Sequence, residues 1–362
     1  MTLTTSYVST PSLTLNGTRD ARAMQNVLSL TVEESIAGMS WCEATFNNWG
    51  TTNRIPGYLF LDRSTLDLGT RLSVQIGPDG GGERGRDVFA GRISALRADY
   101  PAGAPATVMV SAEDNLQDFR ITRRTRTFDD CSTGDLVRTL AGDHGLTAKV
   151  GVSGPKRKVT TQLNQSDLAF LRAVARSDGG EVWLEGQTLH VEPRVNREQG
   201  GVSLSYGENL LSFSVQADLA HQCTDVAVAG WSVADKQAIR EEAGSSTITG
   251  ELGPGQTSGS TVLGQALITR HETLVRTQSP ASDDARSLAR AAYLERARRF
   301  VCGTGTAVGT PLLRVGTQVA LSGLSGLFNG DYRVTRTSHH FDVAQGYLTD
   351  FDVQRAGIGA AR

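Results

Sequence analysis

The chain of 362 residues is long enough for two or three domains with separate cores, and its net charge of −2 supplies no overall basic field for nucleic acid or membrane. Its 39% hydrophobic and 20% charged residues are ordinary for a globular protein, and no run approaches the roughly 18 apolar residues that span a bilayer. The 40 glycines and few aromatic residues are typical of short strands joined by tight turns.

The N-terminal segment MTLTTSYVSTPSL has neither a basic region nor an apolar run, so Sec-dependent export is not expected. The four cysteines lie far apart and form no CxxC or CxxH pattern, which argues against a zinc site. We interpret them as buried thiols in a reducing compartment. They are Cys42, Cys131, Cys223 and Cys302.

The first hundred residues predict β-strands, because apolar and polar residues alternate along them. The expected strands are Val27–Glu33, Cys42–Phe46, Leu72–Ile76, Phe89–Ala95 and Val108–Ala112. The glycine-rich segment Gly77–Asp87 lacks the GK[ST] ending of a phosphate loop, so we interpret it as an exposed hairpin tip. Residues 1–125 are therefore expected to form a first barrel-like β domain.

Residues 126–195 have a different pattern, which predicts a small α/β insert domain. Ser132 and Asp135 have the spacing of a capping box, with Asp in place of the usual Glu or Gln, and an apolar helical stripe follows them. A second helix begins at Ser166 and ends at the pair Gly179-Gly180. Two short strands are then expected to turn at Glu185-Gly186.

Strand patterns return in residues 196–362, which we assign to a second barrel-like β domain. Strands are expected at Leu211–Val215, Thr224–Val228 and Ala266–Arg270. A long helix at 283–301, with Ser282 as its N-cap and Gly303 at its end, interrupts them. The arginines on its outer faces indicate either a solvated surface or a contact surface for another subunit.

The two β regions contain similar segments. Leu68–Val74 (LGTRLSV) matches Val315–Leu321 (VGTQVAL), and Phe89-Ala-Gly91 matches Phe328-Asn-Gly330. We interpret this as a duplicated three-strand unit, the alternative being a chance match of short β patterns. Unclosed sheets leave unpaired edges, and three copies of a chain with two similar units would close them as a ring of six similar positions.

Several short motifs lie along the chain beside the internal repeat. The residues of the motifs and of the repeat are Phe89, Gly91, Gln162, Asp167, Phe170, Leu171, Gly179, Gly230, Trp231, Pro311, Gly316, Phe328, Gly330, Tyr332, His339, His340, Gly346 and Tyr347. In their order and spacing these motifs resemble the late control gene D family of phage tail proteins, which is similar to the hub part of VgrG proteins and to the baseplate hub of contractile-tailed phages. Ser232 departs from the family pattern, in which an acidic residue is expected after the Gly-Trp pair.

The resemblance implies a mainly β (α+β) protein with two barrel-like domains flanking the insert, assembled as a homotrimeric, pseudo-hexameric ring. It implies a structural hub that adapts a hexameric inner tube to a trimeric spike, without catalysis, cofactor, metal, nucleic acid specificity or membrane insertion. Expected partners are a separate spike protein, inner tube or tube-initiator proteins and other baseplate components. Assembly is expected in the bacterial cytoplasm, as a component of a phage tail or contractile injection particle that can be released from the cell.

Other functions are less well supported by the residues. A secreted adhesin or carbohydrate-binding module would need an export signal, and a hydrolase would need a convergent triad or metal set. His339 and His340 are adjacent, so in a strand they point to opposite faces and do not easily share one metal. The segment Gly303–Gly309 follows a helix and precedes a strand, the reverse of a dinucleotide loop.

Overall fold

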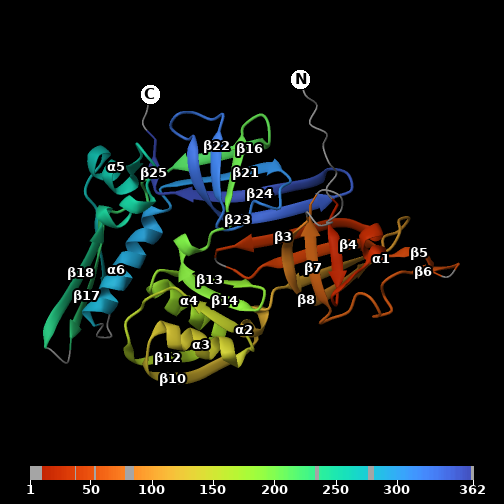
Figure 1. Ribbon diagram of the computed structural model, residues 1–362, viewed down its shortest axis with the longest axis horizontal. Helices are drawn as coiled ribbons and strands as arrows, with labels where there is room; N and C mark the ends of the chain where they lie inside the picture. Colours follow the sequence, from red (N-terminus) through yellow and green to blue (C-terminus); the bar gives the residue numbers. More distant parts are fainter. Residues whose placement is uncertain are drawn as a thin grey trace.

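The computed structural model describes residues 10–36, 38–52, 54–77, 85–232, 236–275 and 281–359. Within them, 13 strands form one large sheet in the order β16-β21-β24-β23-β3-β4-β9-β8-β7-β1-β2, with β22 beside β23 and β15 beside β22. The sheet joins the C-terminal and N-terminal parts of the chain (Figure 1). The protein is therefore mainly β, as predicted. The expected hairpin tip falls largely on residues 78–84, which lie outside the described residues.

The first β unit contains all five strands predicted for it. Its strands in the large sheet are β1 (Ser12–Leu15), β2 (Thr18–Arg19), β3 (Val27–Ser35), β4 (Trp41–Asn47), β7 (Arg71–Ile76), β8 (Arg86–Asp99) and β9 (Thr107–Glu113). Helix α1 (Ala21–Asn26) lies beside them, and the hairpin of β5 (Trp49–Thr52) and β6 (Ile55–Tyr58) projects outward. Alternate residues such as Val32, Val74 and Val110 are fully buried and form the core.

The second β unit repeats this arrangement. Its strands in the large sheet are β15 (Gly201–Ser205), β16 (Leu210–Ala217), β21 (Val301–Val308), β22 (Gln318–Ser322), β23 (Gly330–Asp342) and β24 (Gly346–Arg355). The order β16-β21-β24-β23-β22 corresponds to β3-β4-β9-β8-β7 of the first unit. Equivalent strands are antiparallel to equivalent neighbours, so the predicted duplication is confirmed as a structural repeat.

Hydrogen bonds define the correspondence between the two units. The N–H of Gly69 donates to the carbonyl of Ile93 at 2.8 Å, and the N–H of Gly316 donates to the carbonyl of Val334 at 3.0 Å. Both glycines have positive φ, +83° and +94°, which glycine adopts without strain. The same β-bulge follows in each copy, between Ile93 and Ala95 and between Val334 and Arg336.

This correspondence corrects one part of the sequence comparison. Arg71 pairs with Arg92, and its counterpart Gln318 pairs with Arg333. Gly91 is therefore equivalent to Tyr332 and not to Gly330, so the match of the second strands was wrong by two residues. A shift of two residues preserves the alternation of inward and outward side chains, so the sequence pattern does not reveal it.

The insert has the helices and the hairpin that the sequence predicts. Its elements are α2 (Gln117–Ile121), β10 (Arg123–Cys131), α3 (Thr133–Asp143), β11 (Thr147–Val150), β12 (Arg157–Ser166), α4 (Asp167–Ser177), β13 (Gly180–Glu185) and β14 (Thr188–Pro193), followed by the 3-10 turn η1 (Arg194–Asn196). The capping box is confirmed, since the Asp135 N–H donates to the Ser132 hydroxyl at 3.2 Å and the Ser132 N–H donates to the Asp135 carboxylate at 3.1 Å.

A further layer packs beside the second unit. Its elements are β17 (Asp225–Ser232), β18 (Gln237–Gly244), η2 (Ser245–Thr247), η3 (Thr249–Glu251), β19 (Thr257–Ser258), α5 (Gly259–Ala266), β20 (His271–Val275), α6 (Ser282–Ala297) and β25 (Gly357–Ile358). Ala285, Ala289 and Tyr293 of α6 are fully buried against the β18-β17-β20 sheet. Two arginines of α6 and the arginine that follows its last residue form ion pairs with glutamates of the same chain. The pairs are Arg286–Glu241, Arg296–Glu272 and Arg298–Glu251.

Three predictions for this layer were wrong. A strand was expected at Ala266–Arg270, but Ala266 is the last residue of α5 and strand β20 begins only at His271. The expected helix 283–301 ends at Ala297, while Val301 and Gly303 belong to β21. Buried apolar residues continue from the helix into the strand, so hydrophobic periodicity extends past the helix end. Ser282 is not the N-cap: it is the first helical residue, and its hydroxyl donates to Glu241.

Gly91 offers a test of the close approach of β8 to β9. A Cβ at this position would lie 2.2 Å from the carbonyl oxygen of Glu113, which is a backbone atom that cannot rotate away. We expect Gly91→Ala to lower the free energy of unfolding by about 1–3 kcal/mol, measured by urea denaturation.

The matched control is Gly57→Ala in β6, where a Cβ would meet nothing within 4 Å. We expect this variant to change the free energy of unfolding by less than about 0.5 kcal/mol. Equal effects of the two substitutions would contradict the close approach at Gly91.

Candidate functional site

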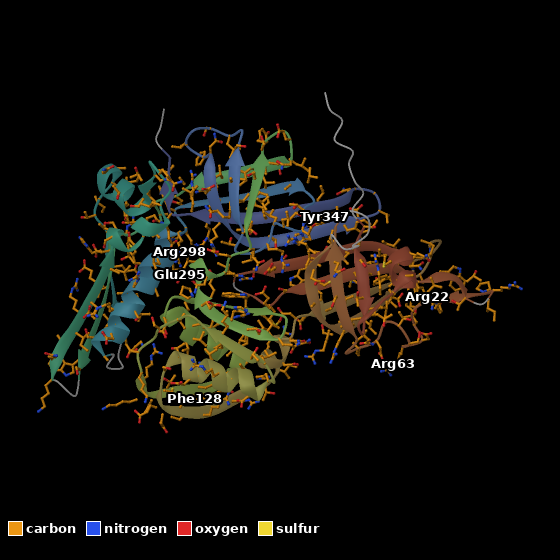
Figure 2. The ribbon with its side chains drawn as sticks, in the orientation of Figure 1. Arg22, Arg63, Phe128, Glu295, Arg298 and Tyr347 are labelled. Carbon is orange, nitrogen blue, oxygen red and sulfur yellow. The ribbon has the colours of Figure 1, made fainter. Side chains whose placement is uncertain are left out.

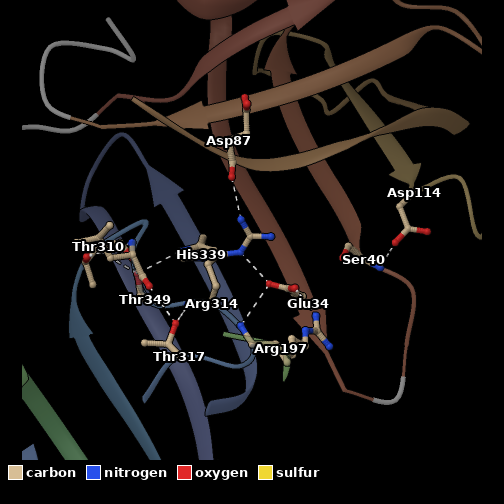
Figure 3. Close-up of polar contacts among 12 residues, drawn as sticks. Glu34, Ser40, Asp87, Asp114, Arg197, Thr310, Arg314, Thr317, His339 and Thr349 are labelled. Carbon is tan, nitrogen blue, oxygen red and sulfur yellow. Dashed lines mark hydrogen bonds and ion pairs between the residues drawn. The ribbon is translucent and has the colours of Figure 1, made fainter. Parts of the chain in front are cut away.

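The two β units and the insert meet at one carboxylate. Glu34 lies near the end of β3, where the strand alternation turns its side chain inward. Arg197, just after η1, donates from Nη2 to Oε1 of Glu34 at 2.6 Å. Arg314, in the loop before β22, donates from Nε to Oε2 at 2.8 Å (Figure 3). Glu34 therefore joins the first unit to the second unit and to the end of the insert.

The surroundings keep this carboxylate ionised. Burial by itself would raise the pKa of Glu34, but the charges of Arg314 and Arg197 and their hydrogen bonds outweigh it and lower the pKa to about 2. Arg314 also donates from Nη1 to the carbonyl of Asp87 at 2.8 Å, which extends the contact to β8. The Arg197 guanidinium lies over the ring of Trp183 in β13, 5.1 Å from the ring centre.

A backbone junction runs beside this ion pair. β23 pairs with β3 in antiparallel register from Arg336 opposite Ser35 to Asp342 opposite Ser29. Phe341 and Tyr347 of the second unit are 6% and 9% exposed and lie in the core of the first unit. Figure 2 labels Tyr347 where the two units meet. The junction thus combines backbone pairing with apolar burial.

The adjacent histidines lie on opposite faces of β23, as predicted. His339 is 1% exposed, and its Nδ1 lies 2.8 Å from the Tyr347 hydroxyl. Burial lowers the pKa of His339 to about 3, so the ring is neutral and acts as a structural hydrogen-bonding group. His340 is half-exposed and lies 3.2 Å from the hydroxyl of Thr31 on β3, so it belongs to the junction between the units.

A second carboxylate organises the insert. Asp167 is buried and accepts hydrogen bonds from Gln162 at 2.8 Å, His144 at 2.9 Å and Arg126 at 2.9 Å. Burial would raise the pKa of Asp167, but these bonds and the Arg126 charge hold it below its usual range. The sequence identified Gln162 and Asp167 but missed Arg126 and His144, which no local pattern connects to them.

Asp114 fastens the insert to the first unit. Its carboxylate accepts the N–H of Ser40 at 2.7 Å and the N–H of Leu116 at 2.9 Å. Ser40 precedes β4 of the first unit, and Leu116 precedes α2 of the insert. The two hydrogen bonds therefore fix the segment through which the chain passes from the first unit into the insert; Figure 3 shows the bond to Ser40. Burial raises the pKa of Asp114 to about 6 in spite of these bonds.

The other motif residues have packing and turn roles and do not converge on one site. Phe170 and Leu171 lie in the insert core, and the Phe170 ring stacks on Phe128 with centres 5.7 Å apart. Tyr332 is 1% exposed in the second core, and its hydroxyl donates to the carbonyl of Phe328 at 2.8 Å. Trp231 is 53% exposed on β17, next to Gly230. Pro311 is partly buried and Phe89 is buried, while Gly179, Gly330 and Gly346 have positive φ.

The described residues contain no group of three His, Cys, Asp or Glu side chains placed to hold a metal ion. Burial raises the pKa of the Cys42 thiol, which removes its thiolate character. No helix in the described part of the chain is long and apolar enough to cross a membrane.

The fold of this chain is similar to the folds of two solved phage tail proteins. The 43 kDa tail protein of prophage MuSo2 from Shewanella oneidensis superimposes with a TM-score of 0.70 at 15% identity, covering 96% of this chain and 98% of that chain. The tail protein from Neisseria meningitidis MC58 superimposes with a TM-score of 0.66 at 15% identity, covering 96% and 97%.

The E. coli c3393 protein, a type VI secretion component with structural similarity to the T4 tail proteins gp27 and gp5, superimposes with a TM-score of 0.56 at 10% identity, covering 96% of this chain and 79% of that chain. The family model described as the Alg8 N-terminal domain matches residues 5–342, so the chain belongs to that family. No curated protein matches the sequence. The predicted resemblance to tail hub proteins is confirmed at the level of the fold.

Glu34 offers a test of the central ion pair. We expect Glu34→Gln to lower the free energy of unfolding by about 3–5 kcal/mol at pH 7, because it leaves two largely buried guanidinium groups without their counter-charge. Since the pKa of Glu34 is lowered from 4.5 to about 2 on folding, the carboxylate stabilises the fold fully above pH 4.5 and loses this effect as the pH falls toward 2. The difference between wild type and variant should shrink over this range.

Glu33→Gln is the matched control for urea denaturation across this pH range. Its partner Arg336 is 39% exposed, so the loss should be at most about 1 kcal/mol. A loss from Glu34→Gln that is no larger than the control's, or that stays constant down to pH 2, would contradict the role of the buried pair.

Proposed function

We propose that this chain is a structural hub of a phage tail or contractile injection particle, with a non-catalytic role. The observation that carries the proposal is the pairing of β3 with β23, which joins two equivalent β units side by side in one sheet. The fold shared with the Shewanella and Neisseria tail proteins supports it. Glu34 and His339 take part in packing contacts, and the extended sheet is the feature on which this proposal rests.

The joined sheet supports assembly into a homotrimeric ring. A sheet that ends in open strands exposes unpaired N–H and C=O groups, and a repeated head-to-tail contact removes them by closing on itself. Three chains with two equivalent units each supply six similar positions around an axis. Such a ring adapts a hexameric inner tube on one face to a trimeric spike on the other.

The proposed partners follow from the same arrangement. They are a spike protein supplied as a separate chain, inner tube or tube-initiator proteins, and other baseplate components. We propose that the ring assembles in the bacterial cytoplasm without a cofactor. The proposed domains are residues 1–125, 126–195 and 196–362, with Leu116 and Phe119 of the first range packing into the core of the insert.

The mass of the purified chain tests the ring. We expect light scattering to give three times the 38.6 kDa of one chain, or that mass plus the mass of the bound spike when the spike protein is added. Electron micrographs along the axis should show six similar lobes, and in whole particles the ring should lie between tube and spike. A monomer at every concentration, or a position away from the particle axis, would contradict the proposal.

A further inference from the structure

Two edges of the large sheet pair with no other strand in the described part of the chain. Beyond residue 93, the side of β8 that faces away from β9 is open along Ala95–Asp99. The side of β16 that faces away from β21 is open along Ser212–Ala217. Edges of this length are rarely left free, because their backbone groups form a template for pairing with another strand.

The repeat shows what each edge pairs with in the other copy. β8 is equivalent to β23, and β16 is equivalent to β3. A β-bulge near the start of each strand aligns β16 with β3, since it lies between Leu210 and Ser212 in one and between Val27 and Ser29 in the other. Within one chain β23 and β3 pair with each other. The two open edges are therefore the second, unsatisfied copy of a contact that the chain already makes once.

The exposed fractions of equivalent side chains support this view. On β23, Thr337, Ser338 and His339 are at most 1% exposed. Their equivalents on β8, residues 96–98, are all partly or fully exposed. On β3, Leu30 and Val32 are at most 1% exposed, whereas their equivalents on β16, residues 213 and 215, are only partly buried. Both open strands thus have the exposure that β23 and β3 would have without each other.

Tyr100 marks the end of the open β8 edge. It is equivalent to Phe341, which is 6% exposed because it inserts into the core of the first unit. Tyr100 is 61% exposed, and its ring lies against that of Tyr58, with centres 5.7 Å apart. The same position therefore holds a buried aromatic ring in one copy and an exposed one in the other.

We propose that the β8 edge of one chain pairs with the β16 edge of a second copy of the chain, antiparallel and in the register of β23 with β3. This inference rests on the ring proposed above and names its subunit contact. The register sets Tyr100 opposite Phe213 of the partner copy and Asp99 opposite Ser214. The Ser214 hydroxyl then donates to the Asp99 carboxylate where Thr31 and His340 meet at 3.2 Å within one chain.

The contact is head-to-tail, since each copy offers β8 to one neighbour and β16 to the other. It reproduces the geometry of the internal junction, so every step around the ring is alike and the six sheet units become one closed sheet. Insertion of Tyr100 beside Phe213 covers the part of the second core that is open in a single chain, as Phe341 covers the first.

Disulfide cross-linking tests the register. Asp99→Cys with Ser214→Cys, in a Cys302→Ser background, places thiols on facing positions of the two edges, because directly opposed residues in antiparallel strands have the Cα separation that a disulfide needs. We expect covalent dimers and trimers on a non-reducing gel under mild oxidation, with none larger. The control pair Asp99→Cys with Val215→Cys has side chains on opposite faces and should cross-link far less.

The outcomes separate this inference from the proposed function. A trimer by light scattering that forms no disulfide with the facing pair, or cross-links equally with the control pair, overturns the edge pairing and leaves the ring. A ladder beyond the trimer supports the edge pairing and overturns the closed ring. A monomer without cross-links at any concentration overturns both.

Tyr100→Ala provides a second readout without cysteines. Because Tyr100 is exposed in the single chain, its removal should leave the free energy of unfolding of the chain unchanged, while the dissociation constant of the assembly rises by more than about tenfold. Leu163→Ala removes a similarly exposed apolar side chain, 66% exposed on β12 of the insert, and should leave association unchanged. Equal association of the two variants overturns the role of Tyr100.

Discussion

The backbone pairing between β3 and β23 is the constraint on which the structure depends. It turns two similar sheets into one and brings Phe341 and Tyr347 into the core of the neighbouring unit. It also brings Glu34 close to Arg314, so the central ion pair exists only where the strands are paired. The insert is then held between the units by Arg197 at one end and Asp114 at the other.

The carboxylates of Glu34 and Asp114 differ in whether their surroundings stabilise the ionised form. Glu34 has two arginines and stays ionised well into the acid range, whereas Asp114 accepts hydrogen bonds from two backbone N–H groups and burial raises its pKa to about 6. Ionised Asp114 therefore opposes stability at neutral pH, in contrast to ionised Glu34.

Local signals in the sequence were sufficient for much of the fold. Alternation identified the strands of the first unit, the Ser132 capping box identified α3, and the glycines Gly69 and Gly316 marked the repeat. The pairing of β3 with β23 left no local signal, because its register depends on side chains that are far apart in the chain. The end of α6 was missed because buried apolar residues continue into β21. For the candidate site, the sequence identified the motif residues Gln162 and Asp167, but no local signal pointed to their partners Arg126 and His144.

The central junction also sets an order of events during synthesis. Thr31 and His340, which meet across the junction, are 309 residues apart in the chain. At roughly 5–20 residues per second, β3 leaves the ribosome about 15–60 s before β23 exists to pair with it. During that interval the first unit carries a bare strand and an incomplete core, so the nascent chain is most exposed to misassociation before its last thirty or so residues emerge.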